Sequence, residues 1–232
     1  MPLFMNQKFL IFVLIVVAEI ASAYAGIWQG VYVFKPLIML SLLYWCKHYW
    51  HTHKWLWIGM WFALAGDIFL MIRERDMFVA GLGAFLLMQV CYIIAFWQSN
   101  RASLKSNWWL LALPFIVYGI VFLMVLHPSF AQNVANQPLW IPVVAYACCL
   151  CSMGVAANFR YNAVPNNSYK WVLIGAILFI LSDSGIAINK FLYPFETSTL
   201  FIMSTYAAAQ WLIVWGVAKK QESSANNDRR FL

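Results

Sequence analysis

The stretch WLWIGMWFALAGDIFLMI, residues 55 to 72, is almost wholly apolar but carries one carboxylate, Asp67, close to its end. A helix needs about 20 predominantly apolar residues to cross the roughly 30 Å hydrocarbon core of a bilayer. The whole chain has this character, because 64% of its 232 residues are hydrophobic and only 10% are charged. Soluble domains carry about 25% charged residues. The sequence therefore predicts an integral membrane protein.

Eight apolar runs, separated by short polar loops, predict eight transmembrane helices in a single domain over residues 1–232. Continuous apolar runs argue against a membrane β-barrel, whose strands alternate apolar and polar residues. We therefore expect an all-α bundle, with residues 219–232 as a short polar C-terminal tail. The runs lie at residues 9–25, 31–46, 55–72, 77–97, 108–126, 139–157, 169–189 and 198–218.

The first run imitates a signal peptide, because Lys8 precedes the apolar stretch and small residues follow it at 21–23. Glu19, however, lies just before the apparent cleavage site. We expect this run to remain as the first span.

The charges of the loops predict the orientation of the chain. With eight spans, both termini and the 2–3, 4–5 and 6–7 loops share one side. Cytoplasmic loops carry an excess of Lys and Arg, so we expect both termini in the cytoplasm, as in a bacterial inner-membrane protein. Topology thus explains the net charge of +7, and we expect membrane lipids but neither nucleic acid nor an obvious protein as partners. The cations on this side are Lys8, Lys47, Lys54, Arg101, Lys105, Arg160, Lys170, Lys219, Lys220, Arg229 and Arg230.

Ionisable residues also gather at one depth, toward the non-cytoplasmic ends of five spans. A charged residue near the middle of a span costs about 2.5–3.5 kcal/mol on insertion scales. Such residues pair, face a polar cavity or stay neutral. Pairing of each lysine with an aspartate would be a purely structural explanation, whereas the shared depth favours a common polar cavity. The residues are Glu19, Lys35, Asp67, Asp76, Asp183 and Lys190.

Two further polar pairs each share a helix face: Gln89 with Tyr92, and Tyr206 with Gln210. They are predicted either to hydrogen-bond between helices or to contact a substrate.

A weak internal symmetry places Asp67 and Asp183 at corresponding positions, each in the third span of a four-span half. This placement suggests a 4+4 parallel internal repeat.

Motifs for other chemistries are absent from the sequence. It contains no Gly-rich phosphate loop and no G-x-S-x-G elbow. His48, His51 and His53 lie in the cytoplasmic 2–3 loop beside lysines, which is more typical of a basic interfacial loop than of a metal site. We expect neither a metal nor a cofactor.

Five motifs, in order along the chain, resemble the YhhN-like family of membrane lysoplasmalogenases. They are FKPL at 34–37, GDIFLM at 66–71, FVAGLGAF at 78–85, LSDS at 181–184 with NKF at 189–191, and YAAAQWLIV at 206–214. The resemblance implies a membrane hydrolase that cleaves the vinyl-ether bond of lysoplasmalogens. Its substrate would be a lysophospholipid, and its products a fatty aldehyde and glycerophospho-ethanolamine or -choline.

The ionisable residues suit this reaction. An acid must protonate the β-carbon of the vinyl ether, and a carboxylate must stabilise the resulting cation and activate water, as paired carboxylates do in glycosidases. We expect Asp67 and Asp183 to be the catalytic pair, with the acid and base roles unassigned. The predicted substrate-binding residues are Lys35, Lys190, Asn189, Glu19, Tyr206 and Gln210.

Two other functions compete with hydrolysis. A small transporter or proton-coupled carrier could use Asp67 and Asp183 as a proton relay, and a scaffold or lipid-binding protein could use the polar cluster only for structure. The one-sided depth of the charges argues against a carrier, whose site usually lies near the midplane.

Overall fold

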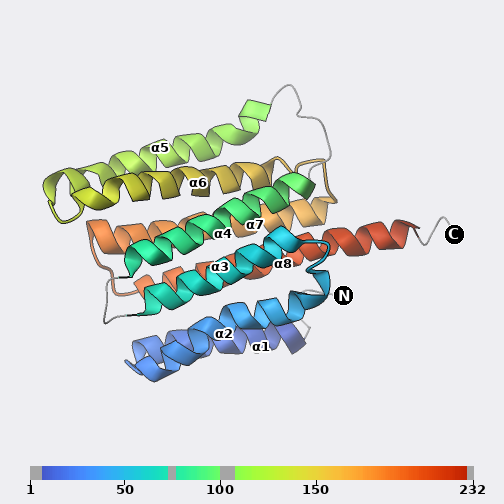
Figure 1. Ribbon diagram of the computed structural model, residues 1–232, viewed down its shortest axis with the longest axis horizontal. Helices are drawn as coiled ribbons and strands as arrows, with labels where there is room; N and C mark the ends of the chain where they lie inside the picture. The colour runs from blue at the N-terminus through green and yellow to red at the C-terminus, as the bar shows by residue number, and fades with distance from the viewer. Residues whose placement is uncertain (1–6, 73–76, 100–107, 229–232) are drawn as a thin grey trace.

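A computed structural model describes residues 7–72, 77–99 and 108–228, with the side chains of the last helix described up to residue 218. Within these ranges the chain forms eight long α-helices and no β-strand (Figure 1). Each helix is long and apolar enough to cross a membrane, which confirms the predicted multi-pass membrane protein. The helices are α1 (Gln7–Tyr24), α2 (Trp28–Cys46), α3 (Lys54–Met71), α4 (Phe78–Ser99), α5 (Trp108–Gln132), α6 (Trp140–Asn158), α7 (Asn166–Ala187) and α8 (Ser198–Asp228).

Two helices run further than their apolar runs. Helix α5 continues to Gln132, and α8 continues through the polar residues 219–228, so most of the predicted tail is helical. The sequence AKKQE that follows the apolar part of α8 consists of good helix formers. Hydropathy therefore marks where a span leaves the hydrocarbon, and not where the helix ends. Three short turns, η1 (Lys47–Tyr49), η2 (Gln137–Leu139) and η3 (Ile188–Leu192), join the long helices.

The helices lie side by side along the long axis of the molecule, with α5 and α6 at one edge and α1 and α2 at the other (Figure 1). Helix α3 packs against α4, α7 packs against α8, and α4 also packs against α6. Of the described spans α8 is the most buried, whereas α1 and α5 are the least. The interior is therefore built mainly from α3, α4 and α6 to α8.

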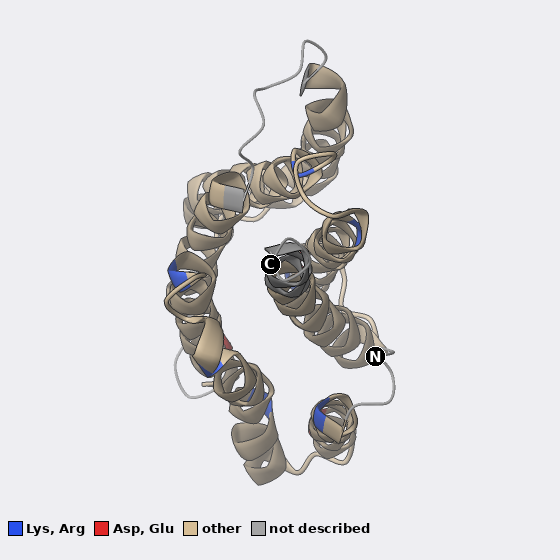
Figure 2. Ribbon diagram, turned by 90° about the vertical axis from the view of Figure 1, so that its right-hand side faces the viewer, with Lys and Arg blue, Asp and Glu red and all other residues tan. Residues whose placement is uncertain are grey.

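The start of α1 and the end of α8 lie at the same end of the bundle (Figure 1), and Figure 2 views the molecule from this end. Helices α3 and α7 run away from this end, and each carries its aspartate one turn before its last residue. The end-on view shows that little of the bundle carries charged residues (Figure 2). Asp67 and Asp183 therefore lie at similar depth, near the end opposite to the termini.

Two glycines allow the helices that carry these aspartates to approach their neighbours closely. A Cβ atom on Gly66 would lie 2.7 Å from the ring of Phe85 in α4, and one on Gly175 would lie 2.9 Å from the carbonyl oxygen of Ala209 in α8. Small residues at such contacts let helices pack tightly where no hydrophobic effect drives them together. The α3–α4 and α7–α8 pairs are thus close-packed hairpins, and each holds one aspartate.

Arg160, predicted to be one of the cytoplasmic loop cations, is fully buried in the connection between α6 and α7. Its Nη2 donates to Ser168 Oγ (2.9 Å), and this hydroxyl donates in turn to the carbonyl oxygen of Gly216 in α8 (2.6 Å). The guanidinium also lies 5.7 Å from the ring centroid of Phe96 in α4. Burial lowers the pKa of Arg160 to about 10. Arg160 therefore ties α4, α7 and α8 together.

Some residues of the predicted charge pattern cannot be placed. Asp76 and the cations Arg101, Lys105, Arg229 and Arg230 lie outside the described residues, as do the side chains of Lys219 and Lys220.

Candidate active site

Asp67 is buried in the interior near the end of α3, with 2% of its surface exposed. The hydroxyl of Tyr206 in α8 donates to its Oδ2 at 2.8 Å. Lys35 of α2 and Glu19 of α1 lie close enough to interact electrostatically with Asp67 and with each other. The structure thus brings together four of the residues predicted for the site.

Asp183 has a tyrosine partner of its own. The hydroxyl of Tyr146 in α6 donates to Asp183 Oδ2 at 2.6 Å, and Tyr146 is buried. Sequence reasoning missed Tyr146, because 37 positions separate it from Asp183 and the two residues lie on different helices. Each aspartate therefore accepts a hydrogen bond from a buried tyrosine on another helix.

Two phenylalanines lie beside Tyr206, the partner of Asp67, and one of them also lies beside Asp183. The ring of Phe85 is centred 5.9 Å from that of Tyr206 and 6.3 Å from that of Phe179, which is itself 5.8 Å from Tyr206. Phe85 also lines the pocket that contains Asp183. Among the described residues no hydrogen bond joins Asp67 to Asp183. Phe85 therefore lies between two separate pairs, Asp67 with Tyr206 and Asp183 with Tyr146.

The pocket next to Asp183 lies between α3, α4, α6, α7 and η3, and has a volume of about 50 Å³. Asp183 and Tyr146 supply its polar groups, whereas Asp67 is not one of its lining residues. This pocket is therefore lined by one of the two aspartates that were predicted to share a cavity, and the shared cavity stays a prediction. The apolar walls are Leu70, Phe78, Leu82, Phe85, Val143, Ile186, Ala187 and Phe191.

Lys190 and Asn189 belong to the η3 turn beside this pocket. The exposed Lys190 places its Nζ 4.3 Å from the ring centroid of Phe78, a lining residue. Asn189 Oδ1 accepts from the backbone N–H of Phe195 at 3.2 Å. A cation therefore stands at the edge of the pocket, on a turn that Asn189 fastens to the segment after it.

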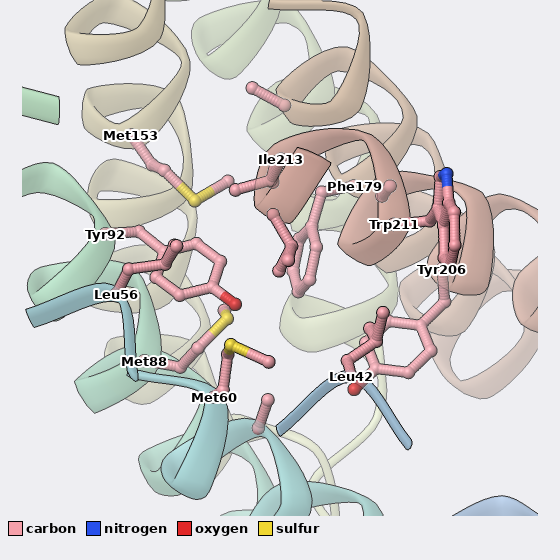
Figure 3. Close-up of a cluster of buried hydrophobic side chains, with 14 of the residues drawn as sticks. Leu42, Leu56, Met60, Met88, Tyr92, Met153, Phe179, Tyr206, Trp211 and Ile213 are labelled. Atoms are coloured by element: carbon pink, nitrogen blue, oxygen red, sulfur yellow. The ribbon is translucent and has the colours of Figure 1, made fainter. Parts of the chain in front are cut away.

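A second polar contact crosses the core between α4 and α8. Tyr92 donates to Gln210 Oε1 at 2.7 Å, and Gln210 Nε2 points at Met88 Sδ at 3.6 Å. Figure 3 shows Tyr92 beside Met60 and Met88 in this part of the core. Tyr92 and Gln210 thus form a hydrogen bond between two helices, which is one of the two roles predicted for these polar residues. Gln89 is equally buried, but its Nε2 and Oε1 have no hydrogen-bond partner in the described part of the chain.

This arrangement can carry out acid–base chemistry on an apolar molecule. A carboxyl group lining an apolar pocket can transfer a proton to a bound group, and a second carboxylate nearby can stabilise positive charge. Within the described residues, no three His, Cys, Asp or Glu side chains are grouped to hold a metal ion.

Comparison with known proteins gives a family and several named relatives. Residues 30–217 match the model of the YhhN family. The chain is 29% identical over 167 residues to the lysoplasmalogenase TMEM86A of Homo sapiens. The aligned region covers 72% of this chain and 66% of the human protein. The chain is 32% identical over 164 residues to a lysoplasmalogenase of Mycobacterium tuberculosis (strain CDC 1551 / Oshkosh), which covers 70% and 60%.

The chain therefore spans slightly less than two thirds of the length of these relatives. No solved structure matches it.

Proposed function

Because the chain belongs to the YhhN family, we propose that it hydrolyses the vinyl-ether bond of lysoplasmalogens. The products are a fatty aldehyde and glycerophospho-ethanolamine or -choline. The observation that carries this proposal is the carboxyl of Asp183, held by Tyr146 in an otherwise apolar pocket. An apolar pocket suits the alkenyl chain of such a lipid, and a carboxyl group in it suits the proton transfer that vinyl-ether cleavage requires.

The reaction divides into three steps. A proton adds to the β-carbon of the vinyl ether, which leaves an oxocarbenium ion at the carbon bonded to oxygen. Water adds to this carbon and loses a proton, which gives a hemiacetal. The hemiacetal then collapses to an aldehyde and the free glycerol hydroxyl. One proton is given and one is recovered, so a single carboxyl group can serve both steps.

The two aspartates have different tasks in this proposal. Asp183 lines the pocket, so it contacts the reacting atoms and transfers the proton. Asp67 is separated from the pocket by Phe85, and Tyr206 orients its carboxylate through a hydrogen bond. The negative charge of this carboxylate stabilises the oxocarbenium ion through the low-dielectric interior. Lys35 and Glu19 set the electrostatic environment of Asp67.

The substrate binds with its phosphate on Lys190, the cation at the pocket edge. A volume of about 50 Å³ is far smaller than a whole lysolipid, so the pocket takes the reacting group and the attacking water, and the rest of the alkyl chain lies between helices in the hydrocarbon. Asn189 supports this site by fastening the η3 turn. Tyr206 and Gln210, predicted as substrate contacts, act instead through Asp67 and Tyr92.

The orientation of the chain follows the loop charges. We place both termini in the cytoplasm of a bacterial cell and the pocket in the non-cytoplasmic half of the inner membrane. The α3–α4 and α7–α8 hairpins, each with one aspartate, support a 4+4 parallel repeat. A fluorescent protein fused to the C-terminus is expected to fluoresce, and alkaline phosphatase fused there to be inactive; the opposite pair of results would reverse the orientation.

The test of the proposed function is aldehyde release by the purified protein. We expect lysoplasmenyl-ethanolamine to give aldehyde, and the matching acyl and saturated-ether lysolipids to give none, because only the vinyl ether forms an oxocarbenium ion on protonation. Folded protein that binds the lipid without releasing product would favour a lipid-binding scaffold. Folded protein without binding or turnover would favour the carrier, which a proton-flux assay in liposomes would then test.

A further inference from the structure

One face of α4 forms a wall of the pocket next to Asp183. Phe78, Leu82 and Phe85 line this pocket, and their spacing places all three on one face of the helix. Phe78 lies at the pocket edge, where the Nζ of Lys190 is 4.3 Å from its ring centroid. Phe85 lies two turns further along α4, or about 10 Å along the helix axis. Phe85 is therefore the aromatic wall residue of α4 that lies away from the lysine.

Contacts with three other helices hold the ring of Phe85 in place. Its centroid lies 5.9 Å from that of Tyr206 in α8 and 6.3 Å from that of Phe179 in α7, and both pairs have edge-to-face geometry. A Cβ atom on Gly66 of α3 would lie 2.7 Å from two carbons of this ring. The lining residues of the pocket do not include these three, and Phe85 is buried. The ring is therefore fixed by neighbours outside the pocket and is shielded from water.

The reacting carbon of a lysoplasmalogen is expected close to this ring. In the proposed function the lipid phosphate lies on Lys190 at the pocket edge, and the glycerol backbone separates the phosphate from the vinyl ether. The vinyl ether therefore lies further inside, where Asp183 and Phe85 line the pocket. Protonation of its β-carbon places a positive charge on the next carbon and on the ether oxygen, beside an aromatic wall.

We propose that Phe85 is a catalytic residue whose ring stabilises the oxocarbenium ion through a cation–π interaction, an inference that rests on the proposed vinyl-ether hydrolysis. The face of an aromatic ring attracts a cation, and the attraction is stronger where water is excluded. The ring forms no bond to the cation and removes no proton from it, so it does not compete with the water that must add. Asp67, which Phe85 separates from the pocket, acts on the same charge at longer range.

The first test replaces Phe85 by phenylalanines that carry one, two or three fluorine atoms on the ring. Each fluorine withdraws electron density from the ring face, which weakens a cation–π interaction stepwise, while the ring stays apolar and nearly the same size. We expect log kcat on lysoplasmenyl-ethanolamine to fall with each fluorine, to about 30-fold below the wild type for the trifluoro ring, with little change in KM. The melting temperature in detergent is expected to stay close to that of the wild type.

Phe179 is the matched control for this series. It is also buried and packs against both Phe85 and Tyr206, but it is not a lining residue of the pocket. The same fluorinated rings at position 179 are expected to leave kcat unchanged. A kcat that is flat across the series at position 85, or that falls equally at both positions, would show that Phe85 acts only through packing. The proposal would then be wrong.

The second test measures binding and needs no turnover. A saturated lysolipid with a secondary amine in place of the ether oxygen carries a positive charge where the oxocarbenium ion forms. We expect the wild type to bind this amine more tightly than the saturated ether lysolipid. The trifluoro ring at position 85 is expected to reduce this preference by about ten-fold, because it weakens binding of the cation and not of the neutral ether. An unchanged preference would contradict the proposal.

The two proposals fail in different ways. No aldehyde from folded wild-type protein contradicts the proposed hydrolysis itself. Normal turnover of the trifluoro variant at position 85, with an unchanged preference for the amine, leaves the hydrolysis intact and removes Phe85 from the mechanism.

Discussion

Asp183→Asn is expected to lower kcat on lysoplasmenyl-ethanolamine by about 10³- to 10⁴-fold, at the upper end of what a general acid–base group contributes. Asp183 is the carboxyl group that lines the pocket, and an amide can neither give a proton to the β-carbon nor take one from water. The fold should persist, because the Asn oxygen still accepts the hydrogen bond from Tyr146. Aldehyde release under single-turnover conditions measures this effect.

The matched control is Glu196→Gln, which removes an exposed carboxylate from the segment between η3 and α8. A surface change of this kind typically alters stability by less than about 0.5 kcal/mol, and turnover is expected to stay within about two-fold of the wild type. Equal turnover of Asp183→Asn and Glu196→Gln, in folded proteins, would remove Asp183 from the chemistry.

Asp67→Asn is expected to lower kcat by about 10²-fold with little change in KM. Its carboxylate is absent from the pocket lining and acts on the developing cation through the protein interior, so it contributes to the transition state more than to substrate binding. Tyr206 can still donate to the Asn oxygen, which preserves the packing of α3 against α8. Steady-state kinetics beside the thermal melting curve of the variant measure both quantities.

Tyr206→Phe provides the comparison for this second change. It removes the hydroxyl that orients Asp67 and keeps the charge, so its kcat is expected to lie between those of the wild type and Asp67→Asn. A loss in Asp67→Asn that appears wholly in KM would mean that the carboxylate binds substrate. Unchanged kinetics would make Asp67 a structural residue.

The helices were predictable because each depends on its own composition. The apolar run of residues 55–72 is long enough to span a membrane by itself, and α3 occupies Lys54–Met71. Depth was predictable for the same reason, since the position of Asp67 within its run fixes its distance from the helix end. The length of α8 was not, because its polar continuation is set by helix propensity and not by hydropathy.

The partners of the aspartates depend on how the helices pack, which the order of residues does not reveal. Tyr206 was singled out only as part of a polar face, and its contact with Asp67 joins residues 139 positions apart. Tyr146 lies in an apolar stretch with no second polar residue to mark it. Gln89 and Tyr92 were assigned to one helix face because they are three residues apart, yet the structure turns Tyr92 toward α8 and Gln89 toward α6.

The enclosed Arg160 has a consequence for the order in which the protein is made. Chains fold broadly in the order of their synthesis, and α8 is made after α6, after α7 and after the loop between them that carries Arg160. The hydroxyl that holds Arg160 is itself held by Gly216 of α8, so the guanidinium keeps its water until that helix arrives. The burial of this charge is therefore completed only when α8 packs against α7, after the loop that carries Arg160 has already been made.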